Sequence, residues 1–298
     1  MKIFAIVVTY NGMMWYDRCL GSLRDSGTPV ETIVIDNASS DGTVEYIKGH
    51  FPDVHLIESK ENLGFAKANN IGIRYAIDHD ADYVFLLNQD AWIEPTTIAE
   101  LINTFDHNPM AGVVSPIHLN GTHNAMDTRF ADYIGMSADA FPFNKEMSRY
   151  IKPVFVNAAA WLISKKCIET VGGFDTNLFV HYGEDNNYCQ RVQYHGFDLV
   201  VNTQAFICHD RESRSGLTDD SRQKWMEILR QEEIAECWSD INIHYNMSRL
   251  IQHRRLKFLV ACLTLKLKKA KRHYDTIQIM KKVAFSRGQN MIKQLNWL

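Results

Sequence analysis

Buried-strand patterns and helix patterns alternate across residues 3–115 of this 298-residue chain. Continuous apolar, β-branched runs predict strands that are covered on both faces. Because neighbouring parallel strands need a crossover that is usually a helix, the alternation predicts an α/β fold with a mostly parallel central sheet flanked by helices. The predicted strands are Ile3–Val8, Thr32–Ile35, Val54–Ile57, Tyr83–Leu87 and a short strand near Val113.

Polar residues follow the ends of these predicted strands. Thr9-Tyr10-Asn11 come after the first strand, Asp36 after the second and Asn88-Gln89-Asp90 after the fourth. Ligands of parallel α/β sheets bind at the carboxyl ends of the strands, so these side chains are candidate ligand contacts. Other roles stay open for two of them. Asp36 can instead cap the following turn, and Asp90 can either cap its own turn or bind a divalent cation that neutralises its charge.

Two common nucleotide-binding motifs are missing from the sequence. No G-x-G-x-x-G follows the first strand, and no G-x-x-x-x-G-K-[ST] occurs anywhere. Their absence argues against a Rossmann dehydrogenase and a P-loop kinase. A carboxylate at a strand end can still hold a nucleotide, because it accepts hydrogen bonds from a base N–H or a ribose hydroxyl.

The second half of the chain is less regular. Residues 120–153 show no periodic pattern and predict a long irregular segment over the sheet. After Gly216 the pattern is helical, so we expect one α/β unit over residues 1–217 and a helical extension over residues 218–298. Between the irregular segment and Gly216, the patterns predict a strand within Asn157–Ser164, helices over Lys165–Val171 and Asp185–His195, and strands at Leu199–Val201 and Ala205–Cys208.

Charged residues in this half are candidates for chemistry. Glu184 and Asp185 form an acid pair at a predicted helix start. One of them can act as a general base while the other orients it, although acids at this position also complement the helix dipole. His209 ends a predicted strand, and the polar loop after it carries Arg211 and Arg214, which can approach a phosphate.

In their order along the chain, these motifs resemble those of the large inverting glycosyltransferase family 2, whose fold is called GT-A, and especially its bacterial rhamnosyltransferase-like members. The resemblance covers about residues 3–216, which would form the catalytic domain, with residues 218–298 as a basic extension. The segments that carry it are residues 7–11, 34–43, 62–72, 85–91 and 172–185.

The resemblance implies roles for individual residues. Asp185 would be the catalytic base with Glu184 supporting it, and Asp90 and His209 would bind Mn²⁺ or Mg²⁺. Asn88 departs from the family pattern, which has an acid there, so the metal site has one negative charge fewer. The nucleotide would be surrounded by Thr9, Tyr10, Asn11, Asp36, Asn62, Asn88 and Asp90, the diphosphate by Arg211 and Arg214, and the acceptor by Trp161. Trp161 can equally pack in the core.

The implied reaction is inverting transfer of a sugar from a UDP- or dTDP-linked donor to a hydroxyl acceptor on a glycan or a lipid-linked precursor, in cell-surface polysaccharide or glycan synthesis. A nucleotidyltransferase is one alternative, but it needs a glycine-rich, basic loop after the first strand, which residues 11–14 do not provide. A catalytically inactive binding protein is the other alternative, and the acid pair argues against it.

Charge is distributed unevenly along the chain. The formal net charge is -3, yet residues 254–298 carry twelve Lys or Arg against the single acid Asp275, a net +11. This segment predicts peripheral contact with an anionic membrane. The alternative is that its apolar residues pack against the α/β unit or against a second subunit of a homo-oligomer. A nucleic-acid partner is not expected, because the basic residues alternate with aliphatic side chains rather than aromatic ones.

Other features predict the cellular compartment. Six cysteines are scattered without a C-x-x-C pair, which predicts reduced, buried thiols. The apolar run at the N-terminus is too short for a signal peptide, and no apolar stretch approaches the roughly 18 residues that a membrane span requires. We therefore expect a cytoplasmic protein, at the inner face of the membrane.

Overall fold

Strand β1 (Ile3–Thr9) lies inside the sheet, and its side chains alternate between two buried layers. Phe4 and Ile6 belong to the apolar cluster on one face, and Ala5 and Val7 to the cluster on the other. Successive side chains of a strand point to opposite faces, so a continuous apolar run suits a strand covered twice. The computed structural model describes residues 1–143, 147–180, 182–211 and 219–298, without the side chains of 219–224.

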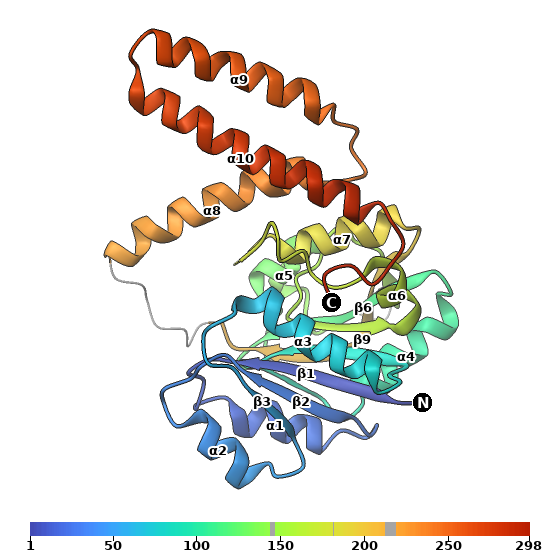
Figure 1. Cartoon of the computed structure of the whole chain (residues 1–298). Helices are drawn as coiled ribbons and strands as arrows, with labels where there is room; N and C mark the ends of the chain where they lie inside the picture. Colours follow the sequence, from blue (N-terminus) through green and yellow to red (C-terminus); the bar gives the residue numbers. More distant parts are fainter. Residues whose placement is uncertain (144–146, 181, 212–218) are drawn as a thin grey trace.

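The N-terminal half of the sheet is parallel, as the sequence predicts. Strand β1 pairs in parallel with β2 (Glu31–Asp36) and β4 (Tyr83–Asn88), and β3 (His55–Glu58) extends the sheet beyond β2. Helices α1 (Tyr16–Arg24), α2 (Thr43–His50) and α4 (Thr97–His107) cover one face, and α3 (Gly64–Asp78) covers the other (Figure 1).

The fold class is the one expected, and the rest of the sheet adds antiparallel strands to the parallel part. In the described part of the chain, nine strands form one sheet with the order β3-β2-β1-β4-β8-β6-β9-β5, and β7 pairs with β9. Strand β8 (Ala160–Ser164) lies between β4 and β6 (Ala111–Asn120) and runs antiparallel to both. Strands β5 (Ala91–Ile93) and β7 (Tyr150–Ile151) are antiparallel to β9 (Asp198–His209), which runs parallel to β6.

Two further expectations are wrong in detail. The segment predicted to be irregular contains helix α5 (Thr128–Tyr133), whose first turn is capped by Asp127 accepting from the Phe130 N–H at 2.9 Å. The two short strands predicted before His209 are one strand, β9, whose pairing with β6 shifts register between Pro116 and Ile117, in the interval between the two predicted strands. A bulge of this kind keeps the pairing while breaking the alternation that sequence patterns detect.

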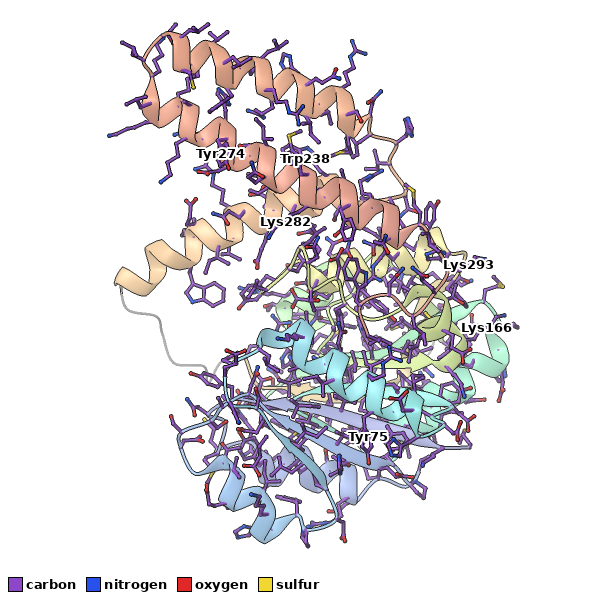
Figure 2. The ribbon with its side chains drawn as sticks, viewed as in Figure 1. Tyr75, Lys166, Trp238, Tyr274, Lys282 and Lys293 are labelled. Carbon is purple, nitrogen blue, oxygen red and sulfur yellow. The ribbon has the colours of Figure 1, made fainter. Side chains whose placement is uncertain are left out.

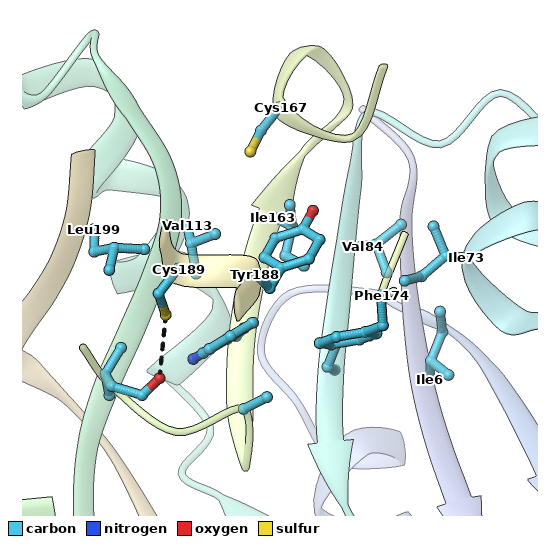
Figure 3. Packing of buried hydrophobic residues seen from close by; sticks show 14 of the residues in the cluster. Ile6, Ile73, Val84, Val113, Ile163, Cys167, Phe174, Tyr188, Cys189 and Leu199 are labelled. Atoms are coloured by element: carbon cyan, nitrogen blue, oxygen red, sulfur yellow. Dashed lines mark hydrogen bonds between the residues drawn. The ribbon is translucent and has the colours of Figure 1, made fainter. Parts of the chain in front are cut away.

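The larger apolar layer lies between the sheet and helices α3, α6 (Lys165–Val171) and α7 (Glu184–Tyr194). Figure 3 shows Phe174 and Tyr188 against the strands, with the thiol of Cys189 directed at a main-chain oxygen; the bond to Val156 O is 3.6 Å long. Four cysteines are buried as expected, but Cys237 is exposed and Cys262 is only partly buried, and none of the six is paired.

The C-terminal helices form an arm that returns to the α/β unit. Helix α8 (Asp219–Ser239) is followed by a hairpin of α9 (Met247–Leu263) and α10 (Leu267–Asn290), which projects away from the sheet (Figure 1). Figure 2 shows Trp238 of α8 and Lys282 of α10 where these two helices pack together. Beyond α10 the chain turns back, and Gly173 N–H donates to Asn296 O at 2.8 Å.

This return ties the extension to the α/β unit. Leu295 and Leu298 pack against its apolar core, and the buried Asn70 of α3 donates to Trp297 O at 2.9 Å. The extension is therefore not a separate appendage. Across the described ranges, no helix has both the length and the apolar character required to cross a bilayer.

Candidate active site

A cavity of about 520 Å³ opens at the carboxyl ends of β1 and β4. We call it the strand-end cavity. Five of the seven residues predicted to surround a nucleotide line it, at the ends of the strands or in the turns that follow them. Its polar lining includes Tyr10, Asn11, Asn37, Asn62, Asn88 and Asp90.

Thr9 and Asp36 do not line this cavity, although both were predicted to contact the nucleotide. They are 0% and 2% exposed, and Thr9 Oγ1 donates to Asp36 Oδ1 at 3.2 Å. The other carboxylate oxygen accepts from Ser39 N–H at 3.0 Å, so Asp36 caps the turn after β2. In place of Asp36, Asn37 faces the cavity; its Oδ1 accepts from Leu63 N–H at 2.7 Å and fixes the turn that carries Asn62.

Side-chain bonds also fix the loop after β1. Gln89 forms two bonds with the main chain of Tyr10, accepting from its N–H at 2.8 Å and donating to its carbonyl at 3.1 Å. Asn11 has a left-handed φ of 47° and accepts from Ser40 N–H at 2.8 Å. The cavity wall is therefore preorganised by bonds between β1, β2 and β4 loops, which lowers the entropic cost of ligand binding.

A second cavity, of about 280 Å³, adjoins the first and shares Phe65 and Asn88 with it. We call it the acid-pair cavity because Glu184 and Asp185 line it. Both acids lie in the first turn of α7, which begins after Gly183 with a φ of 86°. The two cavities form one cleft, with polar strand ends on one side and a pair of carboxyl groups on the other.

Burial sets the protonation of the acid pair. Burial raises the pKa of Glu184, and the neighbouring charges of Asp185, Glu232 and Glu236 raise it further. Burial also raises the pKa of Asp185, although main-chain N–H donors such as Asn186 N, at 2.8 Å, oppose the shift. Glu184 is buried and its Oε2 has no hydrogen bond in the described structure, whereas Asp185 is half-buried. Asp185 is therefore the member of the pair that is better placed to accept a proton from a ligand.

His209 and Asp90 come together, as the sequence predicts. His209 Nε2 lies 3.4 Å from Asp90 Oδ1, and both side chains are almost fully buried. On the other side of the imidazole, Asp127 Oδ2 lies 3.7 Å from His209 Nδ1 and forms an ion pair with Arg211 Nε at 2.7 Å. Arg211 lines the acid-pair cavity while it also pairs with Asp127.

The residues present fit a metal ion carried by a substrate. Within the described residues, no three His, Cys, Asp or Glu side chains are grouped to hold a metal ion alone. One carboxylate and one imidazole side by side can complete the coordination of Mn²⁺ or Mg²⁺ whose other ligands are diphosphate oxygens and water. The neutral amide of Asn88 lies at the junction of the two cavities and adds no charge.

Trp161 is fully buried in β8, its ring 6.2 Å from that of Phe174 and 5.7 Å from that of Tyr188. The expectation that Trp161 contacts the acceptor is therefore wrong, and the core-packing alternative holds, because α6 and α7 cover the face of β8 on which it lies. Arg214 lies outside the described residues.

Sequence reasoning missed several residues of the cleft. Asn37 stands next to the predicted Asp36 and was passed over in favour of that carboxylate. The aromatic wall of the acid-pair cavity comes from distant segments, which no local pattern could bring together. It consists of Phe65, Tyr133, Tyr182 and Trp225.

The mixed α/β sheet, the polar cavity at its strand ends and the adjoining acid pair fit one class of protein, the glycosyltransferases of the GT-A fold. Within this class, the sequence profile described as "Glycosyl transferase family 2" matches residues 4–172, more than half of the chain. The chain therefore belongs to glycosyl transferase family 2, and it is a glycosyltransferase.

Curated relatives include rhamnosyltransferases. The chain is 27% identical over 216 residues to the dTDP-rhamnosyl transferase RfbF of Shigella flexneri, covering 70% of this chain and 69% of that protein. It is 26% identical over 236 residues to the N-acetylglucosaminyl-diphospho-decaprenol L-rhamnosyltransferase of Mycobacterium tuberculosis, covering 71% of this chain and 76% of that protein. These relatives support a nucleotide-sugar glycosyltransferase of glycan synthesis.

Solved structures share the fold at low sequence identity. S. aureus TarS in complex with UDP-GlcNAc has a TM-score of 0.58 and 15% identity, over 98% of this chain and 89% of that one. The mannosyltransferase PcManGT from Pyrobaculum calidifontis, in complex with GDP-Man and Mn²⁺, has a TM-score of 0.53 and 16% identity, over 97% and 87%. Both bind nucleotide sugars, and one was crystallised with a divalent metal.

Proposed function

We propose that the protein is an inverting transferase that moves a hexosyl or deoxyhexosyl group from a UDP- or dTDP-linked donor to a hydroxyl acceptor. The acceptor oxygen would attack the anomeric carbon as the bond from that carbon to the diphosphate breaks, and the configuration would invert. The relative named as a dTDP-rhamnosyl transferase favours a dTDP-linked deoxyhexose. The single observation that carries the proposal is the continuous cleft, in which Asp90 lines one cavity and Asp185 lines the other.

Asp185 would take the proton from the acceptor hydroxyl. A carboxylate with a raised pKa is a stronger base than an ordinary aspartate, and general-base assistance is commonly worth about 10²- to 10⁴-fold in rate. Glu184, deeper and held by burial in its neutral form, would support Asp185 without competing for the proton. The donor would lie in the strand-end cavity, against Tyr10, Asn11 and Asn62.

Asp90 and His209 would hold a divalent metal together with the donor diphosphate. When bound, such an ion supplies positive charge where the departing diphosphate gains negative charge. Arg211, whose Nε lies 3.3 Å from His209 Nδ1, would add a fixed positive charge beside the metal site. Preorganised charges of this kind stabilise the transition state more than the ground state.

The test is donor binding and transfer by wild type, Asp185→Asn and Glu184→Gln. Donors would first be chosen from a panel of UDP-, dTDP- and GDP-sugars by thermal stabilisation. We expect Asp185→Asn to bind the donor normally and to lose transfer by about two or more orders of magnitude, with a much smaller loss for Glu184→Gln. Transfer by Asp185→Asn at a rate near wild type would exclude Asp185 as the base. Donor binding without any transfer by wild type would instead favour the inactive relative, and release of pyrophosphate from a nucleoside triphosphate would favour the nucleotidyltransferase.

The extension, residues 218–298, would attach the catalytic domain of residues 1–217 to the cytoplasmic face of an anionic membrane. The turn of the α9–α10 hairpin supports this, because Leu263, Leu265 and Leu267 are 82%, 83% and 71% exposed rather than packed. Exposed cations surround this turn, at positions 266, 268, 269, 271 and 272. Each cation near an anionic leaflet contributes about 1 kcal/mol, and the leucines add shallow apolar contact.

Membrane contact would bring the enzyme to a lipid-linked acceptor, as the name of the M. tuberculosis relative states for that protein. Co-sedimentation with vesicles of phosphatidylcholine, with and without phosphatidylglycerol, tests the contact. Truncation at residue 253 would also remove the C-terminal segment that packs on the α/β unit, so substitution is the cleaner test. The triple variant L263S/L265S/L267S and the charge variant K268E/K269E/K271E should both lose binding to anionic vesicles, whereas K60E/K166E, exposed elsewhere, should keep it. Equal, negligible pelleting of all proteins would leave the hairpin as an oligomerisation element.

A further inference from the structure

Helix α8 places an aromatic side chain over the acid-pair cavity. Trp225 lines that cavity, and its ring centroid lies 5.1 Å from the ring of Tyr182, at an interplanar angle of 56°. Trp225 belongs to the C-terminal extension, while Tyr182 immediately precedes Gly183 and the acid pair. The two rings therefore join the extension to the catalytic residues across the mouth of the cavity.

Both rings are held in place from outside the cavity. Tyr182 has a left-handed φ of 67°, a backbone conformation that a bulky residue adopts only when its surroundings impose it, and its side chain is 51% exposed. The far end of α8 is fixed to α7, where Asn187 Nδ2 donates to Ser239 Oγ at 3.1 Å. Ala235 of α8 is buried in an apolar cluster with Phe179 and α10. The aromatic pair is thus an anchored surface.

The rest of the cavity is polar, which identifies the chemistry of a matching ligand. Carboxyl groups, amides and guanidinium groups line it beneath the aromatic side chains, including Asn88, Asn157, Asp185 and Arg211. A pyranose ring has C–H groups on its faces and hydroxyl groups around its rim. It can place one face against aromatic rings while its hydroxyls reach hydrogen-bonding groups. A purely apolar chain would leave the polar groups of the cavity without partners.

We propose that Tyr182 and Trp225 form the platform on which the acceptor sugar stacks, so that one of its hydroxyls faces Asp185. This inference rests on the proposed transferase function. It assigns to the extension a direct part in acceptor choice. Trp225, which lines the cavity, takes the role of acceptor contact that was predicted for the buried Trp161.

The experiment measures acceptor binding separately from transfer. The probes are methyl pyranosides, observed by saturation-transfer NMR with the protein loaded with UDP or dTDP, and transfer from the donor to the same glycosides is followed in parallel. We expect Trp225→Ala and Tyr182→Ala each to raise the acceptor KM by about tenfold and to abolish saturation transfer, with donor Kd and donor hydrolysis unchanged. Trp225→Phe should recover most of the binding.

Two matched controls guard against effects on folding. Met226→Ala alters the next residue of α8, which is 63% exposed, and Tyr194→Ala removes an aromatic ring that is 40% exposed at the other end of α7. Both should match wild type. Unchanged acceptor KM in Trp225→Ala, a loss confined to donor affinity, or no saturation transfer from wild type to any glycoside would overturn the inference. Intact glycoside binding without transfer by wild type would count against the proposed transferase function alone.

Discussion

Replacing Asn70 by alanine should destabilise the protein far more than the same change at the adjacent Asn69. Both side chains are buried in α3, at 5% and 2% exposure. Asn69 forms one side-chain bond, from Nδ2 to Phe65 O at 3.0 Å, within its own helix. Asn70 bonds to two other segments, donating to Phe174 O and to Trp297 O, both at 2.9 Å, and accepting from Phe174 N–H at 2.8 Å.

The magnitude follows from these bonds. A hydrogen bond contributes a net of about 1 kcal/mol, and more where its loss leaves a buried main-chain group without a partner. We therefore expect Asn69→Ala to lower the free energy of unfolding by about 1 kcal/mol and Asn70→Ala by about 3 kcal/mol. Asn70 holds the turn that leads toward the acid pair and the returning C-terminus together, so its loss should loosen both.

The assay is urea-induced unfolding followed by circular dichroism, with the midpoints compared at equal slopes. Deleting residues 296–298 should remove one of the three Asn70 bonds and make Asn70→Ala less costly in that background. Equal destabilisation by Asn69→Ala and Asn70→Ala would refute the reasoning, because the two variants differ chiefly in the contacts to Phe174 and Trp297.

Three further predictions concern the metal, the acid cluster and the turn before the acid pair. Nucleotide-sugar binding, measured by calorimetry, should be tighter in Mn²⁺ than in EDTA. Asp90→Asn should remove most of that difference in affinity. Equal affinity of the wild type in both buffers would exclude a metal from the mechanism. Burial and the charge of Asp185 raise the pKa of Glu236 to about 7. Between the ordinary glutamate pKa and this value the native state therefore binds more protons than the unfolded chain. The free energy of unfolding should fall as pH rises through this interval, and it should fall less in Glu236→Gln. A pH dependence identical in both proteins would contradict the assignment. Gly172→Ala should lower the stability several times more than Gly196→Ala. Both glycines have left-handed φ values, 82° and 84°. A Cβ at Gly172 would lie 2.7 Å from Asn296 N, whereas a Cβ at Gly196 would meet nothing within 4 Å. Similar thermal shifts for the two variants would show that the returning C-terminus yields easily.

The N-terminal half of the protein could be predicted closely from its sequence. Buried strands are recorded as apolar runs, and the helices between them as periodic patterns, so the strand ends at Thr9, Asp36 and Asn88 were found within a residue or two. The acid pair, Asp90 and His209 were predicted as site residues because their residue types and order carry a family signal, and the structure places them along one cleft. Local patterns suffice where each element is defined by its own residues.

Tertiary structure decided what depends on residues distant in the sequence. The antiparallel insertion of β8 between β4 and β6 could not be predicted, because an apolar run does not encode its pairing direction. Similarly, an aromatic residue carries no mark of the face it will occupy: Trp161 is covered by two helices, while Trp225 reaches the cleft from the extension. The sequence of the extension makes it basic. Only its fold determines that the hairpin leucines stay exposed and that the last residues return to the α/β unit. The reason is that burial depends on which surfaces meet in space.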